Sequence, residues 1–273
     1  MTVGTPNQVR QQYKLDGFFI HATPIIPKDV IDAAVIGMDE VRMGRYDTGT
    51  PPLPSPWKPG DDPATKLCKI ELPQIANQAI MNLLCHPALG QLAAEVTGAK
   101  ALQIWWVQLL YKPPVLPGMS IKTNVGWHQD RHYWSNWEED SDLFTAWVAL
   151  SDVTPESGPM AFVKGSHQWG KGDGSDFFGQ DLETLKANIL REHHQAWEEV
   201  AAVLSPGGVS FHDDLTYHGS GPNTSRLPRR SFAIHMRGDR SRPKGGCREG
   251  LTQFIDNLDY NPVIYGHRSD FLD

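Results

Sequence analysis

Apolar residues in the first hundred positions recur at the three- and four-residue intervals of amphipathic helices. Such a pattern follows Pro27 and predicts a helix from there to about Met43, since proline suits a first helical turn. Two further helices are predicted at 75–84 and 87–96, the second closed by Gly98. A short helix or turn from about residue 11 leads into an apolar strand at 17–20, and six prolines within 48–64 predict a loop.

From residue 101 the pattern changes to short runs rich in β-branched and aromatic residues, which predict strands. The predicted strands are 101–111, 144–150, 158–163, 201–204, 209–211 and 230–236, with a helical insertion at 181–200. Short strands behind a helical layer favour a mainly β fold with flanking helices, built on a double-stranded β-helix, that is, a jelly-roll or cupin-like core.

We therefore expect one domain over residues 1–273. Its parts are a helical layer at about 1–100, a β-barrel core at about 101–237, a helical insertion at about 170–200 and a C-terminal cap at about 238–273.

Composition narrows the functional classes. A net charge of -7 and the absence of a lysine- or arginine-rich run argue against nucleic-acid binding. The sequence has neither a signal-peptide pattern nor an apolar run of membrane-spanning length, so we expect a cytoplasmic protein with no membrane partner. Its three cysteines are too few and too scattered for a disulfide framework. Oligomeric state is left open.

The stretch 126–130, Gly-Trp-His-Gln-Asp, carries the main candidate chemistry. On a strand, residues two apart point to one face, so His128 and Asp130 can reach the same metal ion. The best third ligand in the sequence is His218, within a segment rich in glycine and serine. Two imidazoles and one carboxylate with the remaining positions open are the ligand set of non-haem Fe(II) oxygenases.

An isolated His-x-Asp pair is more often a surface hydrogen bond than a metal site. Here it is accompanied by His218 and by Arg229, which stands at the start of a predicted strand, where a guanidinium could hold a carboxylate by two hydrogen bonds.

The ordered set of motifs resembles the phytanoyl-CoA dioxygenase family over about residues 13–237. The matching pieces are LDGFF at 15–19, WHQD at 127–130, WVALSD at 147–152, SGPM at 157–160, GSH at 165–167, SPGG at 205–208 and the segment 218–229. The resemblance implies an Fe(II)- and 2-oxoglutarate-dependent dioxygenase that hydroxylates a small molecule with O2, while 2-oxoglutarate is decarboxylated to succinate and CO2. Halogenating relatives lack the carboxylate, so the presence of Asp130 favours hydroxylation or a related oxidation.

Carried over by residue, the resemblance assigns the metal and catalytic site to His128, Asp130 and His218. It places Arg229 on the distal carboxylate of 2-oxoglutarate, with Ser220 and Trp147 lining that end and Lys69 near the cosubstrate. Arg230 would face the opposite way on a strand. His212 and His235 are interpreted as strand residues whose polar atoms are satisfied.

The substrate side is less defined. His132, Trp134, Trp127 and Arg131 are the candidate substrate residues. Aromatic side chains concentrated around them indicate either barrel packing or a pocket for an apolar or cationic small molecule. Arg131 and Arg237 would instead suit an anionic substrate, and the sequence does not decide between these.

Two other functional classes stay open from the residues themselves. A metal-dependent hydrolase or isomerase could use Zn(II) and an activated water on the same barrel. A non-catalytic cupin-like protein could keep the metal as a structural or sensing element. Arg229 distinguishes the oxygenase from the hydrolase, because a hydrolase has no need of a cation opposite the metal.

Overall fold

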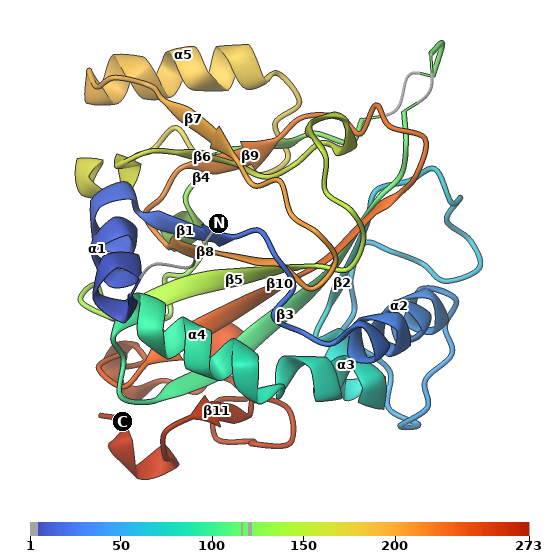
Figure 1. The fold of residues 1–273 in the computed structure, drawn as a ribbon, viewed down its shortest axis with the longest axis horizontal. Coiled ribbons are helices and arrows are strands. Elements are labelled where there is room, and N and C mark those ends of the chain that lie inside the picture. The colour runs from blue at the N-terminus through green and yellow to red at the C-terminus, as the bar shows by residue number, and fades with distance from the viewer. Residues whose placement is uncertain (1–4, 116, 120–121, 273) are drawn as a thin grey trace.

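The computed structural model describes residues 5–115, 117–119 and 122–272. Two antiparallel sheets face each other, and helices cover the outer side of the larger one (Figure 1). The larger sheet has the order β1-β8-β5-β10-β3-β11, with β2 pairing to β3, and the smaller has the order β4-β9-β6-β7. This arrangement confirms the predicted jelly-roll core.

The helices are α1 (Pro6–Asp16), α2 (Lys28–Arg42), α3 (Gln78–Leu84), α4 (Pro87–Thr97) and α5 (Leu182–His193). The strands of the larger sheet are β1 (Phe18–His21), β2 (Cys68–Glu71), β3 (Leu102–Lys112), β5 (Leu143–Ala149), β8 (Val209–Asp213), β10 (Arg229–Gly238) and β11 (Val263–Tyr265). Those of the smaller sheet are β4 (Val125–His128), β6 (Ala161–Val163), β7 (Glu199–Ala201) and β9 (His218–Ser220).

The helical layer forms where the sequence predicts it. Pro87 opens α4 and Gly98 ends it in the left-handed conformation, with φ 79°. Apolar side chains from α2, α3 and α4, such as Met38 and Leu83, pack with outward-facing residues of the large sheet, such as Ile234, in one core. This layer supports the sheet from behind and leaves its inner face for the site.

Strand β10 shows how the sheet separates packing from chemistry, because successive side chains alternate between its two faces. Phe232 and Ile234 join the core under the helices, whereas Ala233 joins a second core between the sheets with Trp147 and Phe162. The polar His235 shares the inner face with Ala233. The inner face of the large sheet therefore carries both apolar contacts and the polar residues of the site.

Some boundaries differ from the predictions. The insertion is helical only over α5, and its end turns into β7, which replaces the predicted strand 201–204. The strand predicted at 158–163 is limited to β6, because Gly158 adopts φ 67° at the end of a short 3-10 turn. The sequence analysis missed β2, β9 and β11. Strand β11 pairs with β3, and Ile255 nearby is fully buried, so the C-terminal segment packs against the barrel.

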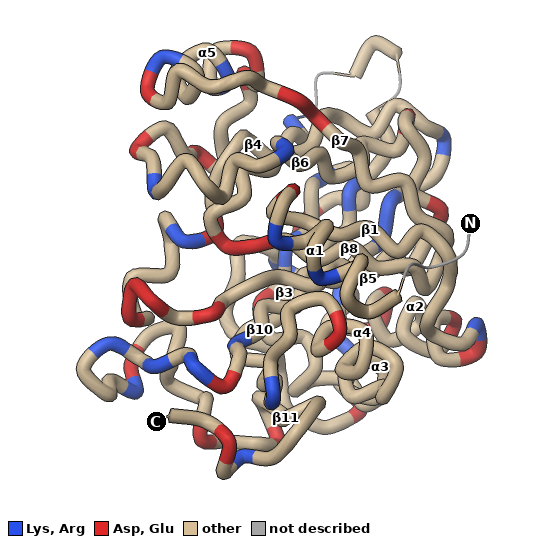
Figure 2. The backbone as a smooth tube through the Cα atoms, turned by 60° about the vertical axis from the view of Figure 1, so that its left-hand side comes forward, with Lys and Arg blue, Asp and Glu red and all other residues tan. Residues whose placement is uncertain are grey.

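Charged positions of both signs are interleaved along the described backbone (Figure 2). Among the described helices, none combines the length and apolarity needed to cross a bilayer. The division into helical layer, core, insertion and cap stays a prediction.

Candidate metal centre

His128 and His218 lie opposite each other on paired strands. His128 is the last residue of β4, His218 is the first of β9, and the two are partners in the antiparallel register. Gln129 stays extended, with φ -107° and ψ 133°, before a 3-10 turn begins at Asp130. Asp130 therefore still points to the side of His128, although the strand itself has ended.

The three side chains converge on one point. The Nε2 atoms of His128 and His218 each lie 3.8 Å from Oδ1 of Asp130, and one ligand atom from each residue falls within 4.8 Å of the others. All three residues are buried. The arrangement matches the two-imidazole, one-carboxylate set predicted from the sequence, and its role in metal binding stays a prediction.

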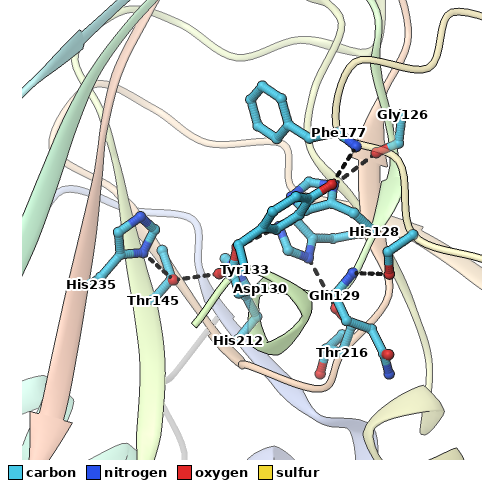
Figure 3. Close-up of polar contacts among 12 residues, drawn as sticks. Gly126, His128, Gln129, Asp130, Tyr133, Thr145, Phe177, His212, Thr216 and His235 are labelled. Atoms are coloured by element: carbon cyan, nitrogen blue, oxygen red, sulfur yellow. Dashed lines mark hydrogen bonds and ion pairs between the residues drawn. The ribbon is translucent and has the colours of Figure 1, made fainter. Parts of the chain in front are cut away.

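Backbone carbonyls fix the tautomer of both imidazoles (Figure 3). Nδ1 of His128 lies 2.8 Å from the carbonyl oxygen of Gly126, and Nδ1 of His218 lies 2.9 Å from that of Thr216. A carbonyl only accepts, so each Nδ1 carries the proton and each Nε2 presents a lone pair to the shared point.

Electrostatics favour the ligand forms of these groups. Burial lowers the pKa of His128, and lowers that of His218 well below its ordinary value, so both are neutral at pH 7. Burial alone would raise the pKa of Asp130, but His218 and the hydrogen bond from His212 outweigh it and hold that pKa well below its usual range. The donor set is thus two neutral imidazoles and one carboxylate.

The second oxygen of Asp130 is held by a row of side chains on the large sheet. Thr145 donates to Oδ2 of Asp130 at 2.7 Å, and its oxygen lies 2.7 Å from Nδ1 of His235 (Figure 3). Since the hydroxyl proton goes to the carboxylate, Nδ1 of His235 donates to Thr145. Nε2 of His212 donates to the same Oδ2 at 3.3 Å.

Both His212 and His235 are strand residues, as interpreted, and Nδ1 of His235 is hydrogen-bonded, but the interpretation of His212 as fully satisfied is wrong. Both line the cavity at the three converging residues, and Nδ1 of His212 is buried with no hydrogen-bond partner among the described residues. Strand register brings the row together, because Thr145 is paired with His235 on one side and with His212 on the other.

The other end of this cavity is positively charged. Arg229 is buried and its guanidinium lies 5.1 Å from the ring centre of Trp147. It donates to the carbonyl oxygen of Gly158, its Nε has no partner among the described residues, and burial lowers its pKa to about 10. Arg230 points away and pairs with Asp39 of α2 at 3.2 Å.

Lys112, at the end of β3, lies behind this end of the cavity and was missed by the sequence analysis. Its Nζ donates to Oγ of Ser220 at 2.6 Å and to the carbonyl oxygen of Gly221 at 2.7 Å. Burial, and then the charge of Arg229, lowers the pKa of Lys112 well below its ordinary value. Two buried cations thus lie near each other, and neither is ion-paired to an acid of the described chain.

A second cavity borders His128 and Asp130, but neither His218 nor Arg229. Its walls are mainly aromatic, and it shares with the first cavity the residues Lys69, Gln108, His128, Asp130, Phe177 and His235. We call the end with Arg229 the cationic chamber and the aromatic side the aromatic chamber. Lys69 lies between them, with its Nζ 4.5 Å from the ring centre of Phe177 and 3.2 Å from Glu71.

Of the four predicted substrate residues, the structure brings only Trp134 into the aromatic chamber. Trp127 precedes His128 on β4 and faces the other way, into a cluster that includes Ile189 of α5. Arg131 turns back to Asp214, with its Nε 2.6 Å from Oδ2. His132 ends the 3-10 turn and lies outside the residues that line either chamber.

The reason is that the backbone folds into a 3-10 turn at Asp130, so strand alternation no longer applies beyond it. Arg237, the other cation considered for an anionic substrate, is buried and donates to Oε1 of Gln103 at 2.8 Å. Neither arginine lines either chamber.

Comparison with known proteins gives independent evidence on the family of this chain. The family model for phytanoyl-CoA dioxygenase matches residues 62–231. A probable alpha-ketoglutarate-dependent hypophosphite dioxygenase of Stutzerimonas stutzeri is 27% identical over 191 residues, which cover 67% of this chain and 62% of that protein. The dioxygenase cdmD of Talaromyces verruculosus is 20% identical over 157 residues, covering 57% of this chain and 46% of that protein.

The chain thus spans less than two thirds of the length of these curated relatives. Among solved structures, the non-heme alpha ketoglutarate dependent carbocyclase SnoK from nogalamycin biosynthesis superposes with a TM-score of 0.68 at 20% identity. The superposition covers 92% of this chain and 90% of that one. At this identity the likeness shows a shared fold.

Proposed function

Because the chain belongs to the phytanoyl-CoA dioxygenase family, we propose that it is an Fe(II)- and 2-oxoglutarate-dependent dioxygenase that hydroxylates a small molecule. In the overall reaction one atom of O2 enters the substrate as a hydroxyl group. The other enters succinate as 2-oxoglutarate loses CO2. The named activity of the Stutzerimonas stutzeri relative supports dependence on the keto acid.

The donor set fits ferrous iron. His128, Asp130 and His218 would hold the ion, since two neutral imidazoles and one carboxylate suit Fe(II) and leave positions for other ligands. When bound, the iron supplies the activation of O2 that no side chain provides. The chain contributes orientation: Gly126 and Thr216 aim the imidazoles, and Thr145 with His212 turns Oδ1 of Asp130 toward them.

The observation that carries the choice of 2-oxoglutarate is the uncompensated positive charge of the cationic chamber. A buried cation is costly unless an anion pairs with it. Arg229 and Lys112 have no carboxylate partner within the described chain. Arg229 lines the end of the cavity that leads to the three converging residues, and Lys112 lies behind it, bonded to Ser220 and Gly221. A dicarboxylate held by Arg229 at its far end would meet this need.

This charge also disfavours the two other classes. A hydrolase that activates water on a metal has no use for a buried guanidinium facing it across the cavity. A purely structural metal site would be closed by protein ligands, whereas all three residues line the cationic chamber and two of them, His128 and Asp130, also line the aromatic chamber.

The proposal is tested by turnover. Protein supplied with Fe(II), ascorbate and 2-oxoglutarate should form succinate only in the presence of O2, even without the primary substrate, at a slow uncoupled rate. His218→Ala should abolish it, and His194→Ala, which alters an exposed histidine outside both chambers, should not. Succinate formation without iron, or undiminished formation by His218→Ala, would exclude this function.

A further inference from the structure

The aromatic chamber has the size and position of a binding site for the primary substrate. Its volume is about 340 Å³, within the range of small-molecule pockets. It borders His128 and Asp130 on the side away from Arg229, so a molecule in it and a dicarboxylate in the cationic chamber would approach the same point from opposite sides.

Its walls are built from rings on three separate segments of the chain. Trp105 and Trp106 lie on β3, Tyr133 and Trp134 follow the turn at Asp130, and Phe177 belongs to the loop before α5. These rings are held in place. Trp105 packs edge-on against Trp134 with ring centres 4.7 Å apart, and the Tyr133 hydroxyl accepts a 2.9 Å hydrogen bond from the Phe177 backbone (Figure 3).

Rings fixed in this way offer flat faces to a flat or cyclic guest. Two exposed aromatic side chains extend the wall to the outside, since Phe178 is 71% and Tyr133 is 41% exposed. The entrance itself is therefore apolar. It suits a small molecule with rings better than a molecule with several negative charges.

Two charged groups of the chamber, Lys69 and Glu71, neutralise one another. Nζ of Lys69 lies 3.2 Å from Oε1 of Glu71, while the indole N–H of Trp106 donates to Oε2 of Glu71 at 2.7 Å. Both oxygens of Glu71 are thus engaged, and Lys69 already faces an acid and the ring of Phe177. Neither charge is left to compensate an ionised guest.

Not every polar group of the chamber is engaged in this way. Gln108 of β3 lines both chambers, and its amide makes no hydrogen bond to the part of the chain that the structure describes. A primary amide both donates and accepts, so it matches a hydroxyl or a carbonyl and gives no preference for either charge.

We propose that the primary substrate is an uncharged, ring-bearing small molecule whose hydroxyl or carbonyl group is bound by Gln108. This inference rests on the proposed function for the identity of the reaction, and it rests on the aromatic chamber alone for the class of guest. Gln108 thereby becomes a residue that determines specificity.

Three probes with one ring system test the charge preference. The affinities of 2-naphthol (neutral), 2-naphthoate (anionic) and 2-naphthylmethylamine (cationic) are measured at pH 7 by calorimetry, using protein loaded with Fe(II) and 2-oxoglutarate under argon. The neutral alcohol should bind at least about tenfold more tightly than either ion, because the ring contacts are equal and only the ions must give up hydration without a counter-charge. Equal or tighter binding of either ion overturns the proposal.

Two variants test the role of Gln108. Gln108→Leu keeps the side chain's bulk and removes the amide, so binding of 2-naphthol should weaken by about threefold to tenfold, as expected for one lost hydrogen bond. Gln91→Leu, an exposed position on α4, is the matched control and should bind as wild type. The assignment is overturned if Gln108→Leu binds 2-naphthol as tightly as wild type. It is also overturned if the variant loses affinity for 2-oxoglutarate and not for 2-naphthol.

Hypophosphite separates failure of this inference from failure of the proposed function. It is the substrate in the name of one relative, and it is a small anion with no ring. If it stimulates succinate formation strongly, the oxygenase activity stands and the ring-bearing substrate class is wrong. If the protein selects 2-naphthol but forms no succinate under any condition, the chamber is as proposed and the assigned reaction is wrong.

Discussion

Thr145 donates a 2.7 Å hydrogen bond to Oδ2 of Asp130, on the side of the carboxylate that faces away from His128 and His218. Oδ1 is thereby left 3.8 Å from Nε2 of both imidazoles. The carboxylate thus has one oxygen for the protein and one for a metal ion.

Removing this hydroxyl should weaken iron binding without unfolding the barrel. Thr145→Val keeps the shape of a β-branched side chain, and we expect its Fe(II) dissociation constant to rise by about tenfold to a hundredfold, as for other groups that orient a metal ligand. Thr145→Ser should restore it, because serine offers the same donor. Anaerobic iron titration measures both, and equal affinities for wild type and Thr145→Val would show that Thr145 only packs.

The two neighbouring arginines of β10 should behave differently. Arg229→Ala removes the buried cation of the cationic chamber and should weaken 2-oxoglutarate binding by roughly 2–5 kcal/mol, a factor of about thirty or more, with iron affinity unchanged. Arg230→Ala removes a cation that pairs with Asp39 on the other face and should leave 2-oxoglutarate binding as it is. Comparable losses in both variants would contradict the assignment.

Lys112 should make 2-oxoglutarate binding depend on pH. Burial lowers its pKa well below the ordinary value, so the free protein loses this positive charge at a lower pH than a solvated lysine would. A bound carboxylate favours the protonated amine, so binding takes up a proton above the lowered pKa, and affinity falls as pH rises. Calorimetry at a series of pH values below the ordinary lysine pKa should show this fall in wild type, and a flatter profile in Lys112→Met. An identical slope in both proteins would assign the pH dependence to another group.

Gly126 has no room for a side chain. A Cβ there would collide with the carbonyl oxygen of Asp176, in the loop that carries Phe177. Gly126→Ala should therefore lower the free energy of unfolding by about 1–3 kcal/mol and displace that loop from the aromatic chamber. Gly221→Ala, where a Cβ meets nothing within 4 Å, is the control. Thermal unfolding compares the two variants. Equal stability would mean that the loop moves to accommodate the added methyl group without lowering the free energy of unfolding.

The sequence predicts the converging residues well because their signals are local. His128 and Asp130 stand two apart in a recognisable motif, and His218 and Arg229 follow in the order expected from the family. The jelly-roll core is equally accessible, since the change from helical to strand periodicity near residue 101 is present in the chain itself.

The contacts that the sequence did not predict depend on strand register and on where a strand ends. Thr145, His212 and His235 form one row only because β5, β8 and β10 align them, and no local pattern encodes that alignment. Lys112 became buried beside Arg229 through the pairing of β3 with β10. Conversely, the sequence does not show that a 3-10 turn begins at Asp130, and this turn directs Arg131 to Asp214 and away from both chambers.

The most direct test of the account is an anaerobic titration of the purified protein with Fe(II) and then 2-oxoglutarate, followed by visible absorption. We expect a weak charge-transfer band that requires both additions, is lost in His128→Ala, Asp130→Ala and His218→Ala, and bleaches on admission of O2 with release of succinate. If iron binds to the wild-type protein and no band forms with 2-oxoglutarate, the cationic chamber does not serve this cosubstrate and the proposed function is contradicted.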